Sequence, residues 1–251
     1  MICVRVLKKW RYVGTGRQDG LKIRCEQSRE SSSLSGATKL KKNENKKMKN
    51  YHIGCGFKIG KSWLNYDSSP IALIDQIPLL NLNDKKFPKN IKYGNIVKKS
   101  LCKENEADNI FCSHVLEHVT LVDGKKMLKN IYKMLKPGGV FRIVVPSLES
   151  RILRYNKDKD ADLFMESLGC VNRNENYNFF RKLRFYFGGS RHKWMFDNKS
   201  LHYELKISGF KNIRECEFGD SGISIFGEVE EKERFIEENG ELKALAFHCI
   251  K

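Results

Sequence analysis

Apolar positions along the chain alternate between short runs that predict strands and a spacing that predicts helices. Runs at 51–53, 63–66 and 140–145 predict strands, and the last is rich in β-branched residues, which is typical of a buried parallel strand. Before it, five apolar residues recur at the three- and four-residue spacing of a helix: Met127, Leu128, Ile131, Met134 and Leu135.

The segment before that helix completes a crossover unit of a parallel sheet. Asp108–His114 is predicted as a strand that ends in small and polar groups, and Val115–Val119 opens a helical segment. The following helix is expected to stop at Pro137-Gly138, which suits the two central positions of a type II turn. Farther on, 200–209 predicts a helix with a glycine stop, and 210–214 predicts the start of a final hairpin.

Glycines follow the first predicted strand and an acid ends the second. Gly54 and Gly56 would let a ligand approach the backbone, and Asp67 could bind the two hydroxyls of a ribose. A tight turn beside a solvated Asp67 explains the same residues. Only six residues separate Gly56 from Trp63, so we expect a loop instead of the helix that usually joins parallel strands.

Single positions argue against two other nucleotide motifs. The dinucleotide fingerprint needs a third glycine where Ile59 stands, and an acid about twenty residues on, whereas Asp67 follows Gly56 by eleven. A Walker phosphate loop that ends at Gly60-Lys61-Ser62 would need a glycine in place of Cys55. Nicotinamide and nucleoside-triphosphate chemistry are therefore disfavoured.

Several motifs occur in a set order from about residue 48 to residue 251. They are His52-Ile-Gly-Cys-Gly56, Ser62-Trp-Leu-Asn-Tyr-Asp67, Ser113-His-Val-Leu-Glu-His118, Leu135-Lys-Pro-Gly-Gly139 and His192-Lys-Trp-Met-Phe196. Together they resemble class I S-adenosylmethionine-dependent methyltransferases, and most of all a bacterial subgroup associated with cell-surface polysaccharide gene clusters. The resemblance implies a Rossmann-like α/β fold, with a mostly parallel seven-stranded sheet, a C-terminal antiparallel hairpin and a cap insertion.

The resemblance also implies where S-adenosylmethionine binds. Asp67 would accept hydrogen bonds from both ribose hydroxyls. Gly54, Cys55 and Gly56 would lie beneath the methionine moiety. Backbone groups at Cys112 or Ser113 would then receive the methionine amino group.

The adenine side of this site departs from the family pattern. Asn95 stands where the family carries an acidic residue that faces the adenine amino group, and its side-chain carbonyl can still accept that bond. We include its neighbour Ile96 among the cofactor-binding residues.

His114 is the candidate catalytic residue, because it follows the fourth strand at the edge where ligands bind in open α/β sheets. A neutral imidazole there could take a proton from the acceptor, or His114 could merely hydrogen-bond a loop. Glu117 and His118 are expected to be structural. The same residues match the His-x-x-Glu-His zinc motif, but this motif belongs inside a helix and the sequence offers no clear third ligand, so we expect no metal.

The positive charge is concentrated in the first part of the chain. The net charge is +17, and residues 1–47 hold 13 Lys/Arg and 4 Asp/Glu, a net of +9. We therefore predict a basic, disordered N-terminal extension over 1–47 and a methyltransferase domain over 48–251. The +8 that remains is more typical of a solvated surface than of a nucleic-acid footprint.

An insertion over 150–193 mixes aromatic and basic residues, especially at 179–187. It could be an amphipathic helix packed on the sheet, and we favour a cap over the acceptor, whose cations would suit an anionic or nucleotide-linked sugar.

Eight cysteines show no paired spacing, and the sequence has no signal peptide and no apolar run of about 20 residues, so we expect a cytoplasmic protein. The predicted reaction is methyl transfer from S-adenosylmethionine to oxygen or nitrogen of a small acceptor, such as a saccharide or nucleotide sugar. A non-catalytic cofactor-binding protein is the alternative, and a nucleic-acid methyltransferase is a weaker one. The sequence does not indicate an oligomeric state.

Overall fold

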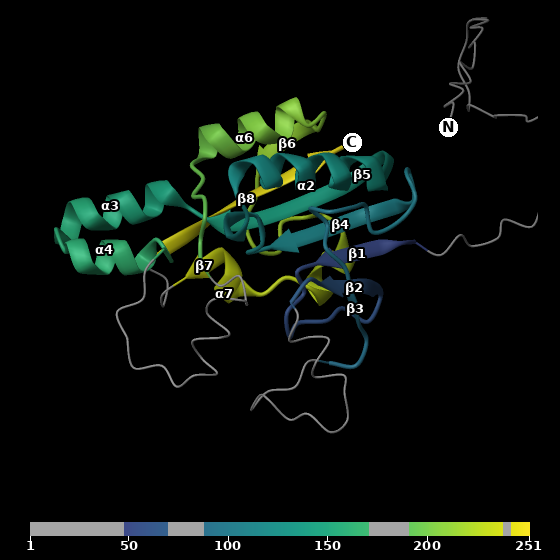
Figure 1. Cartoon of the computed structure of the whole chain (residues 1–251), viewed down its shortest axis with the longest axis horizontal. Helices are drawn as coiled ribbons and strands as arrows, with labels where there is room; N and C mark the ends of the chain where they lie inside the picture. Colours follow the sequence, from purple (N-terminus) through teal and green to yellow (C-terminus); the bar gives the residue numbers. More distant parts are fainter. Residues whose placement is uncertain (1–47, 70–87, 171–190, 238–241) are drawn as a thin grey trace, which may run out of the picture. The chain divides into compact units, whose positions relative to one another are not determined.

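A computed structural model describes residues 48–69, 88–170, 191–237 and 242–251 (Figure 1), which all belong to one unit, Lys46–Lys251. The predicted extension over 1–47 lies outside the described residues. The central sheet has the strand order β3-β2-β1-β4-β5-β8-β6, and a short strand, β7, also pairs with β8. The strands are β1 (Asn50–Ile53), β2 (Trp63–Asp67), β3 (Ile91–Tyr93), β4 (Ala107–Ser113), β5 (Leu135–Pro146), β6 (Lys211–Glu215), β7 (Ile236–Glu237) and β8 (Leu242–Ile250).

Strand directions confirm a mostly parallel sheet that closes with an antiparallel hairpin. The pairs β1–β2, β2–β3, β1–β4 and β4–β5 are parallel. Strand β8 runs antiparallel to both β5 and β6. Seven strands form the path that was predicted, and the two residues of β7 add an eighth.

A loop joins β1 to β2, as their short separation predicts. Asn65 holds this loop, because its Oδ1 accepts from the Gly60 N–H at 3.1 Å and its Nδ2 donates to the Gly60 carbonyl at 3.0 Å. A Cβ on Gly60 would lie 2.2 Å from Cδ1 of Trp63, so this close approach requires glycine.

Helix α2 (Leu121–Met134) begins at Thr120, whose side chain accepts from the Asp123 N–H. It buries four of the five apolar residues whose spacing predicted it, whereas the fifth, Leu135, lies outside the helix and begins β5. The predicted strand 140–145 is therefore longer in the structure. The strand starts early because Leu135 pairs with Ala107. The Pro-Gly-Gly segment forms an irregularity within the strand, and Gly138 there has φ 78°, as a type II turn requires.

Helices cover both faces of the sheet. Alternate residues of β4 belong to different core clusters: Ile110 and Cys112 pack with α2 and α6 (Asn198–Ile207), whereas Phe111 packs with η2 (Ser224–Glu228) and α7 (Lys232–Phe235). Figure 1 shows α2 and α6 on the same side of the strands. Burial on both faces explains the continuous apolar run of β5.

Helices α3 (Leu148–Asp158) and α4 (Ala161–Ser167) follow β5 and extend away from the sheet (Figure 1). They pack on one another, with the rings of Tyr155 and Phe164 5.1 Å apart. They take up the first part of the predicted cap over 150–193, and its aromatic and basic stretch at 179–187 lies outside the described residues. Among the helices that the structure describes, none has the length and apolar character needed to cross a membrane.

An ion pair lies inside the core on the α7 side of the sheet. Arg142 of β5 is fully buried, and its Nε donates to Oε1 of Glu230 at 2.6 Å. Its Nη1 donates to Asp220 at 2.9 Å, and its Nη2 donates to the Glu217 carbonyl at 3.0 Å. These bonds give each guanidinium nitrogen a partner and join β5 to the 217–230 segment.

Glu230→Ala is expected to lower the free energy of unfolding by about 3–5 kcal/mol, because it leaves the buried charge of Arg142 without its closest partner. Urea denaturation monitored by circular dichroism measures this loss. The control is Lys126→Ala, which removes an exposed pair with Asp123 and should cost less than about 1 kcal/mol. Equal losses in the two variants would contradict the structural role of the buried pair.

A chain shortened to begin at Met48 is expected to fold with a melting temperature within a few degrees of that of the full chain, since the first strand begins at Asn50. Differential scanning calorimetry of both proteins makes the comparison. A much larger fall would place part of 1–47 in the folded core.

Candidate functional site

Strand register brings the predicted cofactor residues to one edge of the sheet. Ile53 of β1 pairs with Tyr66 of β2 and with Cys112 of β4. All three strands are parallel, so the residues that come next in each lie at the same carboxyl edge: Gly54, Asp67 and Ser113. Asp67 in turn pairs with Tyr93 of β3, which places the loop that contains Asn95 beside them.

The two glycines after β1 serve different purposes. Gly54 has φ 68°, and a Cβ there would lie 2.1 Å from Cγ2 of Val115. Gly56 has φ 53°, and a Cβ there would meet no atom within 4 Å. Gly54 therefore allows the turn to pack against the chain after β4, whereas the backbone of Gly56 borders open space that a ligand can enter.

Asp67 closes the turn and keeps capacity for a ligand. Its Oδ2 accepts from the Gly56 N–H at 2.9 Å, and its Oδ1 accepts from the Ser69 N–H at 2.7 Å. A carboxylate offers about four acceptor positions, so each oxygen retains one. The predicted contacts with the two hydroxyls of a ribose would use these two remaining positions.

Buried groups form the floor between these strands. Burial, and then the charge of Asp67, raises the pKa of the Cys55 thiol to about 12, so the thiol stays neutral. The Cys55 N–H already donates to the Tyr66 carbonyl at 3.1 Å. Cys112 is buried too, and burial raises the pKa of its thiol well above the usual value. Oγ of Ser113 is buried with no hydrogen-bond partner among the described residues, and the contact of the Cys112 or Ser113 backbone with a methionine amino group stays a prediction.

Asn95 shapes the loop after β3. Its Oδ1 accepts from the backbone N–H groups of Val97 at 3.0 Å and Lys98 at 3.2 Å. Ile96 is buried, and its carbonyl accepts from Asn130 Nδ2 at 2.7 Å. The oxygen that was predicted to accept from adenine therefore already has two backbone donors, and the assignment of Asn95 and Ile96 to the cofactor stays a prediction.

His114 lies directly after β4 in a left-handed conformation with φ 54°. Its N–H donates to the Val144 carbonyl at 2.9 Å, which fixes its backbone. The ring lies between two acceptors, with Nε2 2.9 Å from the carbonyl oxygen of Arg234 and Nδ1 3.3 Å from Oε1 of Glu117. A carboxylate behind one ring nitrogen is an arrangement that can orient an imidazole for proton transfer.

Glu117 lies in the 3₁₀ helix η1 (Leu116–His118) and is fully buried. Burial alone would raise the pKa of its carboxyl, but His114 and then His118 outweigh burial and hold this pKa below the usual value. Neither carboxylate oxygen has an aligned hydrogen bond from a described residue. His118 contacts a backbone group, as was expected of a structural residue, because its Nδ1 lies 3.2 Å from the Arg191 carbonyl oxygen.

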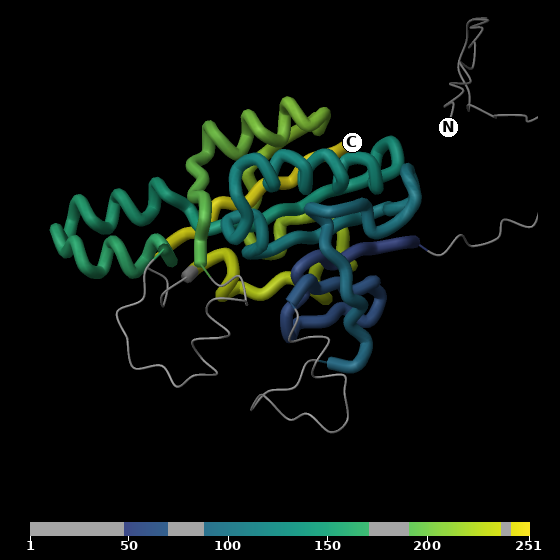
Figure 2. The backbone as a smooth tube through the Cα atoms, viewed as in Figure 1, coloured from purple at the N-terminus to yellow at the C-terminus, as the bar shows by residue number. Residues whose placement is uncertain are grey.

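Two contacts of this site come from distant parts of the chain. The Arg234 carbonyl, 120 residues after His114, belongs to α7. The chain that leads to α6, drawn in green in Figure 2, approaches η1. The N–H groups of Lys193 and Trp194 donate to the Glu117 carbonyl there. Backbone contacts of this kind leave no signal in residue type, so sequence reasoning missed them.

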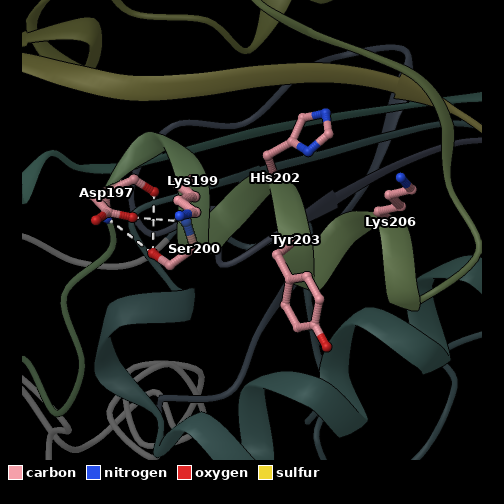
Figure 3. A pocket seen from close by; sticks show the side chains of 6 residues that line it. All are labelled: Asp197, Lys199, Ser200, His202, Tyr203 and Lys206. Atoms are coloured by element: carbon pink, nitrogen blue, oxygen red, sulfur yellow. Dashed lines mark hydrogen bonds between the residues drawn. The ribbon is translucent and has the colours of Figure 1, made fainter.

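A surface depression lies along α6, on a different part of the fold (Figure 3). Figure 3 shows Asp197 and Ser200 turned toward each other, and their hydrogen bonds cap the helix. The lining residues are Asp197, Lys199, Ser200, His202, Tyr203 and Lys206. None of the predicted site residues is among them, so the candidate site is the carboxyl edge of the sheet.

Comparisons with solved structures find related folds at low sequence identity. A methyltransferase from Archaeoglobus fulgidus, described as dependent on S-adenosylmethionine, is 15% identical over 81% of this chain and 86% of its own, with a TM-score of 0.43. One from Methanosarcina mazei is 17% identical over 81% and 92%, with a TM-score of 0.47. Human N-acetylserotonin methyltransferase in complex with S-adenosylmethionine is 15% identical over 80% and 47%, with a TM-score of 0.41. No curated protein matches the sequence.

A family model described as "Methyltransferase domain" matches residues 53–215. The match runs from the end of β1 to the end of β6 and includes the glycine turn, Asp67 and the chain after β4. It confirms the resemblance to methyltransferases that the sequence motifs indicated, whereas the bacterial subgroup stays a prediction. The chain therefore belongs to the methyltransferase domain family, and its methyl donor is S-adenosylmethionine.

Proposed function

We propose that this chain transfers a methyl group to oxygen or nitrogen of a small acceptor that binds beside His114. The observation that carries the proposal is the convergence of Gly56, Asp67 and Ser113 at one edge, next to the imidazole. S-adenosylmethionine supplies a methyl carbon that its sulfonium makes electrophilic. The protein contributes alignment: Asp67 orients the ribose, and Ser113 lies where the methionine amino group is expected.

His114 is proposed as the group that takes the acceptor proton. The Glu117 carboxylate lies beside Nδ1 of His114 and can accept a hydrogen bond from an Nδ1–H group. In that tautomer Nε2 carries the lone pair and is the nitrogen that acts as base. Nε2 contacts the Arg234 carbonyl, which cannot donate a hydrogen bond, so an acceptor hydroxyl or amine has to replace this contact. If His114 only hydrogen-bonds the loop, the alignment of the reacting groups has to account for catalysis without a general base.

For the acceptor we propose a saccharide or nucleotide sugar, on the resemblance to the subgroup associated with polysaccharide genes. The cations Arg191 and Lys193, exposed beside η1, support an anionic acceptor. The alternatives are a protein that binds the cofactor without turnover and, less favoured, a nucleic-acid methyltransferase. Formation of S-adenosylhomocysteine with a panel of nucleotide sugars separates enzyme from binding protein.

We also propose a cytoplasmic location. Six cysteines fall in the part of the chain that the structure describes, and all six are free thiols, as in a reducing compartment.

Asp67→Ala is expected to weaken binding of S-adenosylhomocysteine by about 1.5–3 kcal/mol, because it removes charge-assisted hydrogen bonds to the ribose. Isothermal titration calorimetry measures the change. The control is Asp108→Ala, which removes a carboxylate near the opposite end of β4 and should leave the affinity unchanged. Parental affinity of Asp67→Ala would remove the ribose contact from the site.

His114→Asn is expected to lower turnover by roughly 10²–10⁴-fold, the usual contribution of a positioned acid–base group, with cofactor affinity nearly intact. Asn is chosen because it tolerates the left-handed backbone at this position better than Ala does. Turnover is followed as S-adenosylhomocysteine release with the acceptor that the panel identifies, and His202→Ala on α6 is the control. A loss of only a few-fold would mean that His114 is a wall of the pocket and not the base.

A further inference from the structure

A second cluster of chemically active side chains lies behind the proposed acceptor site. Glu117 and His118 of η1 meet His192, and one ligand atom of each lies within 4.8 Å of the other two. Arg191, the neighbour of His192, is 73 residues from His118 in the sequence. The fold thus brings His192 beside Glu117 and His118, which are adjacent to each other but far from His192 in the sequence.

The backbone around the two rings fixes which nitrogen carries the proton. Nδ1 of His118 lies 3.2 Å from the Arg191 carbonyl oxygen, and Nδ1 of His192 lies 2.8 Å from the Leu168 carbonyl oxygen. A carbonyl oxygen only accepts, so each Nδ1 is the donor. In each neutral ring Nε2 is therefore left with a lone pair, and Nε2 of His118 lies 3.8 Å from Oε1 of Glu117.

These atoms need a positive partner. The Glu117 carboxylate is fully buried, and neither of its oxygens accepts an aligned hydrogen bond from a described residue, although Nδ1 of His114 lies 3.3 Å from Oε1. This contact alone compensates the buried charge poorly, and the imidazoles of His118 and His192, whose Nε2 atoms are acceptors when the rings are neutral, cannot donate to it. A cation among the three groups would take one lone pair from each of them.

We propose that Glu117, His118 and His192 bind one divalent transition-metal ion such as Zn²⁺. Two imidazoles and a carboxylate are a ligand set that such ions favour, and a hydrogen bond from the second ring nitrogen to a backbone carbonyl is the usual support for a metal-binding histidine. With metal–ligand bonds of about 2.0–2.1 Å in a tetrahedron, ligand atoms lie about 3.3 Å apart. The ligand atoms, which lie within 4.8 Å of one another, therefore need to approach by up to about 1.5 Å.

The site differs from the metal motif that the sequence contains. In the His-x-x-Glu-His reading, His114 and His118 would be the ligands, and the absence of a clear third one argued against metal. In the fold, His114 contacts the Arg234 carbonyl instead, and His192 completes the set. The ion would join the 191–194 segment to η1, next to the bonds from Lys193 and Trp194 to the Glu117 carbonyl. This proposal does not depend on methyl transfer.

The test uses the full chain after treatment with a chelator and removal of the chelator by dialysis. Titration with ZnCl₂ in a calorimeter is expected to give one ion per chain, and the ion should raise the melting temperature. His118→Ala and His192→Ala should each weaken binding by more than about 100-fold, since the loss of an outer partner alone costs 10–100-fold. The matched control, His202→Ala on α6, should bind like the parent.

The proposal is overturned if the parent chain binds no stoichiometric Zn²⁺, or if both His118→Ala and His192→Ala keep the ion. It is also overturned if His202→Ala loses the ion as they do. Two variants from different segments are used because a folding defect in one does not affect the reading of the other, and circular dichroism checks each fold. Cofactor binding by the metal-free chain is measured separately, so that a failure of this proposal leaves the methyltransferase assignment intact.

Discussion

Backbone hydrogen bonds on both sides of β1 set the geometry on which the whole site depends. Ile53 is level with Tyr66 on one side and with Cys112 on the other, so the chain leaves three neighbouring strands at the same height. Because side chains alternate between faces, a slip of one residue would turn Phe111 from the α7 side toward α2 and would move Asp67 away from the Gly56 N–H. Packing of side chains on both faces of the sheet therefore fixes the strand register, and with it the carboxyl edge where the predicted cofactor residues lie.

Local patterns predicted most of the fold, and the differences come from pairing between distant residues. The apolar spacing of α2 is correct because one helix face packs on the sheet, and the loop after Gly56 is correct because six residues leave no room for a helix. The early start of β5 could not be predicted, since Leu135 becomes part of a strand only by pairing with Ala107. The Pro-Gly-Gly segment was predicted as a turn, and Gly138 does have the positive φ that a type II turn requires.

In the candidate site, too, some features could be predicted from local sequence and others depend on tertiary contacts. Gly54, Gly56 and Asp67 could be chosen from sequence because they lie at strand ends, where position alone places a residue at the ligand edge. The surroundings of His114 could not be predicted, because its ring contacts a carbonyl from α7 and the buried carboxylate of Glu117, and no local pattern reveals either contact. His192 was noted only in the His192–Phe196 motif and in the cap insertion, since nothing local shows that it lies beside His118. The sequence thus predicted which residues matter by their type and position, but it could not predict their tertiary contacts.

The place of β8 within the sheet has a consequence for the order of folding. Strand β6 pairs only with β8 among the described strands, and β8 lies between β5 and β6. Strand β6 is therefore made first and has no template until β8 has docked on β5. In that interval β5 presents an open, strongly apolar edge, the kind of surface through which chains associate with one another. Pairing of β5 with β8 spans a long stretch of sequence, so it is a slow step, and partly folded chains are most prone to aggregate before it is complete.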